Sequence, residues 1–179
     1  MSVSHERPLL LRAIGAVVQV VAGAAALLVL VACLAAVVKL TLTPSPASVG
    51  IAHTNLRPGA TIRLYLQQPS VRQALLQIGG NVLVGVPFGL ALPVFAPRFR
   101  GVMRVLAATL VVVGALEVAQ HFFVPGRSFD VDDIILALVG ALAGYLLAGR
   151  RLSRLVHPRH RHAWQRYGDR LRRRRAQQT

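Results

Sequence analysis

The stretch AIGAVVQVVAGAAALLVLVACLAAVV, residues 13–38, contains no charged residue and consists mainly of Ala, Val and Leu. A helix needs about 20 residues to cross the hydrocarbon core of a bilayer, so this stretch is long enough to span it with some tilt. The apolar core of a cleaved signal peptide is shorter, about 7–15 residues. A lipobox-like sequence ends at Cys33, but the apolar run continues past it. We therefore expect residues 13–38 to remain in the protein as a transmembrane helix.

Three further apolar blocks follow, at residues 74–96, 105–124 and 134–149. Hydrophobic residues make up 54% of the chain and charged residues 15%, with a mean hydropathy of +0.54, which leaves too little polar surface for a water-soluble domain. Residues 39–73 contain prolines and no long apolar run, and we expect a short interfacial segment there with Tyr65 at headgroup level. The sequence thus predicts an all-α integral membrane protein with four transmembrane helices.

The basic residues divide unevenly between the two sides of such a four-helix arrangement. Sixteen of the 21 Lys and Arg residues fall on the side that holds both termini and the loop at residues 97–104, and five fall on the other side. The positive-inside rule places the larger set in the cytoplasm, so both termini are expected inside and the interfacial segment outside. We accordingly divide the chain into a cytoplasmic N-terminus (residues 1–12), a four-helix membrane domain (13–149) and a basic cytoplasmic tail (150–179).

The predicted tail, residues 150–179, is rich in arginine and has almost no apolar face. We expect it to lie against anionic lipid of the cytoplasmic leaflet, with each basic residue contributing on the order of 1 kcal/mol. The net charge of +15 does not indicate nucleic-acid binding, because no recognition fold accompanies it. His157, His160 and His162 have no cysteine or carboxylate nearby, so no metal site is predicted.

Four of the six acidic residues lie within one stretch of seventeen residues: Glu117, Asp130, Asp132 and Asp133. The predicted topology places that stretch at the outer membrane face, where the third helix ends and the fourth begins. At a rise of about 1.5 Å per residue, Glu117 lies roughly 10 Å below the outer end of its helix. Asn81 lies at a similar depth in the antiparallel second helix, so we expect Asn81 and Glu117 to meet across a helix interface.

Glu117 shares one helix face with Gln120 and His121, because the spacing is i, i+3 and i, i+4. A carboxylate within the membrane costs on the order of a few kcal/mol unless it faces a polar interior, so Glu117 indicates a functional pocket. We expect Glu117 and Asp133 to act as catalytic acid or base groups. The residues expected to bind substrate are Asn81, Gln120, Arg127, Asp130 and Asp132. The alternative interpretation is structural: Asp132 and Asp133 cap the fourth helix, and Asn81 bonds Glu117 across the interface.

These segments resemble the VanZ-like family of membrane proteins. The likeness covers residues 55–149 and comprises Asn55-Leu56-Arg57-Pro58, GNVLVGVPFG at residues 80–89, Glu117-Val118-Ala119-Gln120, and GRSFDVDDIIL at residues 126–136. The pattern E-x-x-Q followed by R-x-x-D-x-D-D is its most specific part. The chain departs from the pattern at Ala137, where the family usually has Asn, and at Gly59, where an aromatic residue is common.

The resemblance implies a multipass protein of the bacterial cytoplasmic membrane that acts on or binds a cell-envelope component at the outer face. The family's namesake accompanies glycopeptide resistance genes and raises resistance to teicoplanin. The implied partners are therefore a lipid-linked envelope precursor or a glycopeptide, beside membrane lipids. Whether the chain is an enzyme stays open. The alternatives are a non-enzymatic binding or assembly protein and a small proton-coupled transporter. No nucleotide-binding loop, metal-ligand spacing or nucleophile–base pair stands out, so no cofactor is expected, and small-residue helix faces permit an oligomer.

Overall fold

The structure, a computed structural model, describes residues 6–41 and 54–157 of the chain. Within these residues, four helices are long and apolar enough to cross a membrane, judged by length and composition: Ala13–Lys39, Val71–Phe95, Val102–Phe123 and Val131–Val156. The predicted all-α class and the four predicted spans are confirmed. Most of the predicted tail, with His160 and His162, lies outside the described residues, so its contact with anionic lipid stays a prediction.

The helical elements are α1 (Glu6–Thr41), α2 (Ala60–Leu66), α3 (Val71–Phe95), η2 (Pro97–Arg100), α4 (Val102–Phe123), α5 (Val131–Gly144), η3 (Tyr145–Gly149) and α6 (Arg150–Val156). The last three elements run on without a break and together form the fourth span. The short helix α2 lies in the predicted external loop, and the single turn η2 connects α3 to α4. The only β-type pairing among the described residues is an isolated parallel bridge between Asn55 and Asp130.

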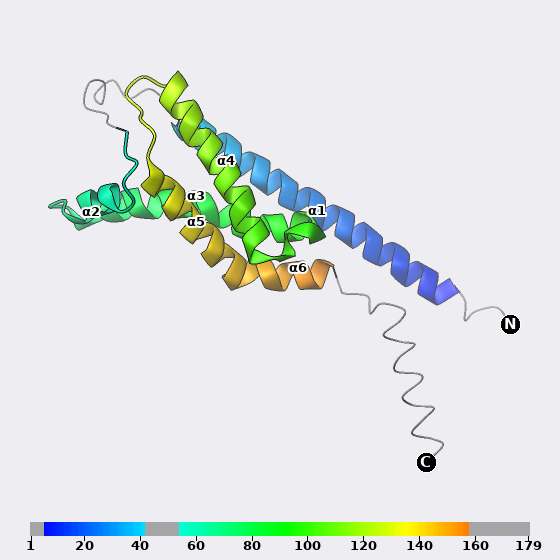
Figure 1. The fold of residues 1–179 in the computed structure, drawn as a ribbon. Coiled ribbons are helices and arrows are strands. Elements are labelled where there is room, and N and C mark those ends of the chain that lie inside the picture. Colours follow the sequence, from blue (N-terminus) through cyan, green and yellow to red (C-terminus); the bar gives the residue numbers. More distant parts are fainter. Residues whose placement is uncertain (1–5, 42–53, 158–179) are drawn as a thin grey trace, which may run out of the picture.

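Helix α3 lies at the centre of the bundle and packs along α5 on one side and α1 on another, whereas α4 packs mainly against α5 (Figure 1). The α3 and α5 helices run parallel, because Gly85 and Gly89 lie against Ala137 and Ala141 in the same order along the chain. Helix α1 runs the opposite way to α3, because its N-terminal half lies beside the end of α3 and Val37, near its C-terminal end, lies by Asn81 and Val84 in the middle of α3. The bundle therefore has two distinct ends.

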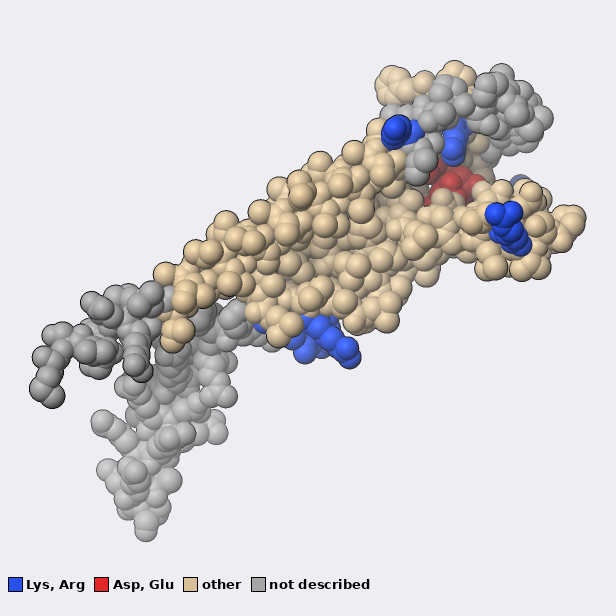
Figure 2. Space-filling view, turned by 180° about the vertical axis from the view of Figure 1, so that it is seen from behind, with Lys and Arg blue, Asp and Glu red and all other residues tan. Residues whose placement is uncertain are grey.

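Polar side chains gather at these two ends. We call one the acidic end, which holds Glu117, Asp130, Asp132 and Asp133, and the other the arginine end, which holds η2, α6 and Arg98, Arg100, Arg104, Arg150 and Arg154. Figure 2 shows the carboxylates in a recess beside a few basic side chains, with another group of basic side chains lying apart from them. Large apolar side chains such as Leu28, Val111 and Leu147 remain exposed along the spans, as expected of surfaces that contact lipid.

The closest approach in the bundle is between α3 and the fourth span, and glycines make it possible. The glycines at this contact are Gly85 and Gly89 on α3 and Gly140, Gly144 and Gly149 on the fourth span. A Cβ added at Gly85 would lie 1.7 Å from the carbonyl oxygen of Ala137, and one added at Gly140 would lie 1.8 Å from that of Val82. Helices in a membrane associate through such small residues, because lipid provides no hydrophobic drive between them. The backbones of the two helices are therefore in direct contact.

A proline frees a backbone carbonyl at this contact near the arginine end. Pro93 has no N–H and leaves the Gly89 carbonyl without its usual helical partner. That carbonyl lies against Gly149, where an added Cβ would be 2.1 Å from its oxygen. Gly149 is the last residue of the π-helical turn η3. The helix continues from there to Val156, seven residues past residue 149, where the membrane domain was predicted to end. The first residues of the predicted tail are therefore part of the fourth helix.

Substituting Gly85 with alanine should destabilise the bundle, because the new methyl group would overlap the α5 backbone. Overpacking of this kind costs typically about 1–3 kcal/mol of unfolding free energy. Gly80 on the same helix has no atom within 4 Å of an added Cβ, so Gly80→Ala should leave stability unchanged or raise it by up to about 1 kcal/mol. The unfolding free energies of both variants are measured by adding increasing SDS to the purified protein in mild detergent and monitoring helix content by circular dichroism. Equal stabilities for the two variants would contradict the close contact.

Candidate functional site

The acidic end begins with a segment of chain that pairs with the start of α5. The backbone N–H of Asn55 donates to the Phe129 carbonyl at 2.9 Å, and the N–H of Val131 donates to the Asn55 carbonyl at 3.1 Å. The Asn55 side chain adds a bond from Nδ2 to Asp130 Oδ1 at 2.9 Å. These bonds attach the loop before α2 to the loop before α5, although the two are about 75 residues apart in sequence.

Asp132 holds the beginning of α2 in place. Its carboxylate accepts backbone N–H groups of Gly59 at 2.6 Å, Thr61 at 2.7 Å and Ile62 at 3.2 Å, and the Asn55 amide at 3.3 Å. The side chain is 0% exposed. Because the first N–H groups of a helix have no partner within it, a carboxylate at this position satisfies them and complements the helix dipole. Gly59 has φ +84°, which glycine adopts without strain, and this explains glycine where the family commonly has an aromatic residue.

Asp130 performs the same task for α5. Its Oδ1 accepts from the N–H of Asp132 at 2.8 Å, which is an N-cap bond, and its Oδ2 accepts from the Thr61 hydroxyl at 2.6 Å. The N–H of Asp130 in turn donates to Glu117 Oε2 at 3.2 Å. The carboxylates of Asp130 and Asp132 therefore join α2 to α5, and the backbone N–H of Asp130 adds a link to α4.

The remaining polar side chains surround a small cavity of about 40 Å³, which we call the acidic cavity. Its polar lining consists of Asn81, Glu117, Gln120, Arg127 and Asp133, and its apolar lining of Val37, Val84, Val113, Leu116 and Ala137. Glu117 and Gln120 are only 6% and 4% exposed, whereas Arg127 is exposed. Asn81 donates a hydrogen bond to the carboxylate of Asp133. A space of this size holds roughly one or two water molecules or the tip of a ligand group.

Tyr65 of α2 lies near these acids. Its own burial, followed by the negative charge of Asp133 and Asp130, raises the pKa of Tyr65 to about 12. The phenol is consequently protonated at physiological pH and can donate a hydrogen bond. The positive charge of the Arg127 guanidinium lowers this pKa and so counteracts part of the effect of the acids.

The predicted site residues fall into two groups. Five of them line the acidic cavity: Asn81, Glu117, Gln120, Arg127 and Asp133. The other two, Asp130 and Asp132, form the adjacent hydrogen-bond network. The amide of Asn81 bonds Asp133 instead of the expected Glu117, because the parallel contact of α3 with α5 brings these two side chains together. His121 is exposed and its ring lies edge-on to Phe122, so it takes no part in the cavity.

Sequence reasoning missed two members of the network, Asn55 and Thr61, as well as the approach of Tyr65 to the acids. Asn55 stood within the segment resembling the family, which was a signal for its importance. Nothing in the sequence marked Thr61, because its bonds depend on how the loop before α2 folds against α5.

The fold and this site define a multipass membrane protein of four helices that encloses a polar cavity at one end. A family model described as VanZ/LLP1 matches residues 27–152, which is well over half of the chain, and the chain belongs to this family. The matched residues include every residue that lines the acidic cavity and every glycine of the α3 contact. Comparison with curated proteins found no match, and neither did comparison with solved structures.

Substituting Asp132 with asparagine should weaken the acidic end. The asparagine side chain has nearly the same shape as aspartate, but its NH₂ group donates hydrogen bonds and cannot accept them. Because the site is buried, at least one backbone N–H of α2 would lose its hydrogen-bond partner. We expect the unfolding free energy to fall by roughly 2–3 kcal/mol. Ser70 caps α3 through one long bond of 3.4 Å, so the control Ser70→Ala should cost only about 0.5–1 kcal/mol.

The same detergent unfolding assay, combined with limited proteolysis of the loop between α1 and α3, checks this prediction. Cleavage around α2 should become faster in Asp132→Asn than in Ser70→Ala. Similar stability and similar cleavage in both variants would show that the Asp132 network does not hold the loop.

Proposed function

We propose that this VanZ/LLP1-family protein binds a phosphate-bearing, lipid-linked component of the cell envelope at the outer face of the cytoplasmic membrane. The observation that carries the proposal is the convergence of five polar side chains, from α3, α4, α5 and the loop before α5, on one cavity. Ionisable groups inside a membrane protein are costly and mark functional sites by default. The excess of basic residues at the opposite side supports an outer location for the acidic end.

Arg127 is the residue we assign to the ligand. It is exposed and also lines the acidic cavity, so its guanidinium is accessible at the edge of the site. A guanidinium binds phosphate through paired, charge-assisted hydrogen bonds, and its positive charge offsets the negative field of the four neighbouring acids. The protonated hydroxyl of Tyr65 is suited to donate a further hydrogen bond to an anionic head group.

Glu117 and Asp133 are the groups we assign to proton transfer. Glu117 is buried, and Asp133 lies within the same cavity, bonded to the Asn81 amide. Two carboxylates that share a small cavity do not ionise independently, and one of them readily holds a proton. Asn81 and Gln120 then orient the ligand or a water molecule between the two carboxylates. Substrate contact by Asp130 and Asp132 stays a prediction, and in this proposal they chiefly hold the edge of the cavity.

A second, non-enzymatic function is favoured by the Asp130–Asp132 network. The oxygens of both carboxylates already accept bonds from the protein itself, and these bonds join α2 to α5. A protein that only binds or assembles envelope components needs such a rigid outer surface and no proton transfer. The two functions predict different results for Glu117→Gln. If Glu117 transfers protons, the variant still binds the ligand but loses the reaction. If the protein only binds or assembles envelope components, the variant chiefly has a lower folded yield.

Binding of a polyprenyl phosphate tests the assignment of Arg127. The full chain in nanodiscs of zwitterionic lipid is titrated with polyprenyl phosphate and, in parallel, with the uncharged polyprenol, and bound lipid is counted by native mass spectrometry. We expect the phosphate to bind and Arg127→Gln to weaken its affinity by roughly tenfold, as loss of a charge-assisted pair predicts. Arg63→Gln, at an exposed position on α2, is the matched control and should bind like the wild type. The proposal would be wrong if polyprenyl phosphate and polyprenol bound equally well. It would also be wrong if Arg127→Gln and Arg63→Gln bound the phosphate with equal affinity.

Glycopeptide susceptibility tests the cellular role. A sensitive bacterium expressing the wild-type chain should become more resistant to teicoplanin than to vancomycin, and Glu117→Gln or Asp133→Asn should abolish the effect at equal membrane abundance. Gln73→Ala, at an exposed position near the start of α3, is the control and should behave as wild type. If the wild type leaves the inhibitory concentration of teicoplanin unchanged, the resistance role is excluded and other envelope substrates remain for the same cavity.

A further inference from the structure

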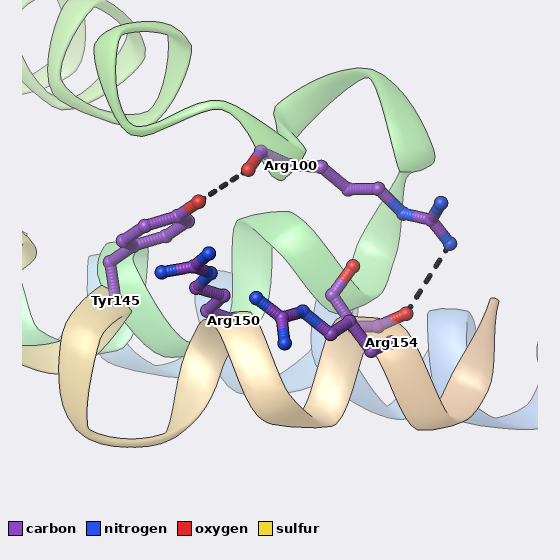
Figure 3. A pocket seen from close by; sticks show the side chains of 5 residues that line it. Arg100, Tyr145, Arg150 and Arg154 are labelled. Atoms are coloured by element: carbon purple, nitrogen blue, oxygen red, sulfur yellow. Dashed lines mark hydrogen bonds between the residues drawn. The ribbon is translucent and has the colours of Figure 1, made fainter. Parts of the chain in front are cut away.

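A second polar cavity lies at the arginine end, far from the acidic cavity. It has a volume of about 510 Å³ and is lined by Arg100, Tyr145, Arg150, Ser153 and Arg154. Arg100 comes from the turn η2 between α3 and α4, and the other four residues come from the fourth span. Figure 3 shows the Arg100 side chain extending from its loop to the fourth span on one side of the space and Tyr145 on the other, with the guanidinium groups of Arg150 and Arg154 between them. We call this space the arginine cavity.

The position of Arg100 is set by the protein. Its Nη2 donates to the backbone carbonyls of Ser153, at 3.4 Å, and of His157, while its own carbonyl accepts a hydrogen bond from the Tyr145 hydroxyl. The last carbonyls of a helix carry a partial negative charge that repels anions. By bonding the carbonyl of Ser153 in the last turn of α6 and that of His157 just beyond the helix, Arg100 places a positive charge at the C-terminal end of α6.

Two polar atoms of the arginine cavity have no partner in the described part of the chain. The Nε of Arg100 and the Oγ of Ser153 are both buried, and neither makes a hydrogen bond. Ser153 is only 1% exposed, so bulk water does not satisfy its hydroxyl. Leaving a buried donor unsatisfied is costly, and such groups in a native protein call for an explanation. A ligand that accepts hydrogen bonds would satisfy both atoms at once.

The charge around this cavity is positive throughout. Three guanidinium groups line it, and the four acids whose side chains are described lie together at the acidic end. The π-helical turn η3 begins at Tyr145 and is followed directly by Arg150, so a break in the regular helix lies beside the cavity. Turns of this kind occur frequently at functional sites in helices. Three guanidinium groups, one of them with an unsatisfied Nε, together with the hydroxyl of Ser153 are suited to bind a phosphate group.

We infer that the arginine cavity binds a phosphate group, carried either by the head group of an anionic phospholipid in the adjacent leaflet or by a free phosphate anion. The guanidiniums of Arg150 and Arg154 provide charge, and Arg100 Nε and Ser153 Oγ donate hydrogen bonds to phosphate oxygens. By the distribution of basic residues, this leaflet is the cytoplasmic one. The inference is independent of the function proposed for the acidic cavity.

Thermal unfolding of the purified full chain in neutral detergent tests this inference. The melting temperature is followed during titration with short-chain phosphatidylglycerol, with phosphatidylcholine as the zwitterionic control, and with inorganic phosphate in a separate arm. A ligand that binds only the folded protein raises the melting temperature, and at a given concentration the rise is larger for tighter binding. We expect phosphatidylglycerol to raise it and the double variant Arg150→Gln, Arg154→Gln to weaken the apparent affinity by roughly tenfold or more. Arg151→Gln, exposed on the same helix and absent from the cavity lining, should respond as wild type.

Ser153→Ala separates binding from fold stability. If the Ser153 hydroxyl bonds only a ligand, its removal should leave the melting temperature without ligand unchanged or raise it. The increase in melting temperature that phosphatidylglycerol produces should then be smaller than in the wild type. A shift with inorganic phosphate that depends on Arg150 and Arg154 supports a free anion as the source, and a shift with phosphatidylglycerol alone supports the lipid. The inference is overturned if the double variant and Arg151→Gln respond alike, or if wild type responds equally to phosphatidylcholine.

Discussion

The direct backbone contact between α3 and the fourth span determines where the other functional parts of this protein lie. Gly85 and Gly140 allow the two parallel helices to touch near the acidic end, and Gly89 and Gly149 allow the same near the arginine end. Parallel helices at this distance bring side chains of equal depth together, so Asn81 meets Asp133 without a long side chain on either helix. The glycines carry no chemistry, but a single methyl group between the helices would separate the two halves of the acidic cavity.

The acidic end illustrates how a membrane protein keeps carboxylates at low cost. Asp132 is fully buried, yet four donors surround it, three of them from the backbone at the start of α2. Glu117 accepts a hydrogen bond from the backbone N–H of Asp130, and its side chain also lines the acidic cavity. Asp132 therefore holds the hydrogen-bond network together, whereas contact of Glu117 with a ligand or a proton belongs to the function proposed above.

Much of this arrangement could be predicted from the sequence, because membrane spans follow from length and hydropathy alone. The same holds for the depth of Glu117 and Asn81, since the helical rise is constant. The partner of Asn81 could not be predicted, because it depends on whether α3 packs more closely on α4 or on α5, and only the register of the glycine contact decides that. The arginine cavity also escaped prediction. Arg100 and Arg154 looked like ordinary basic residues of a loop and a tail, and only the extension of the fourth helix past 149 brings them together.

Ala137 connects the helix contact to the chemistry of the site. Its carbonyl is the atom closest to Gly85, and its methyl group, 1% exposed, lines the acidic cavity beside Asp133. The family usually has Asn at this position, and a side chain of that size would project into the space that this protein leaves as a cavity of about 40 Å³. The amides that line this cavity are those of Asn81 on the facing helix and Gln120 on α4, and both belong to segments that the chain shares with the family pattern. With alanine at position 137 the cavity therefore has one polar group fewer than the family pattern, and it keeps a space large enough for about one water molecule.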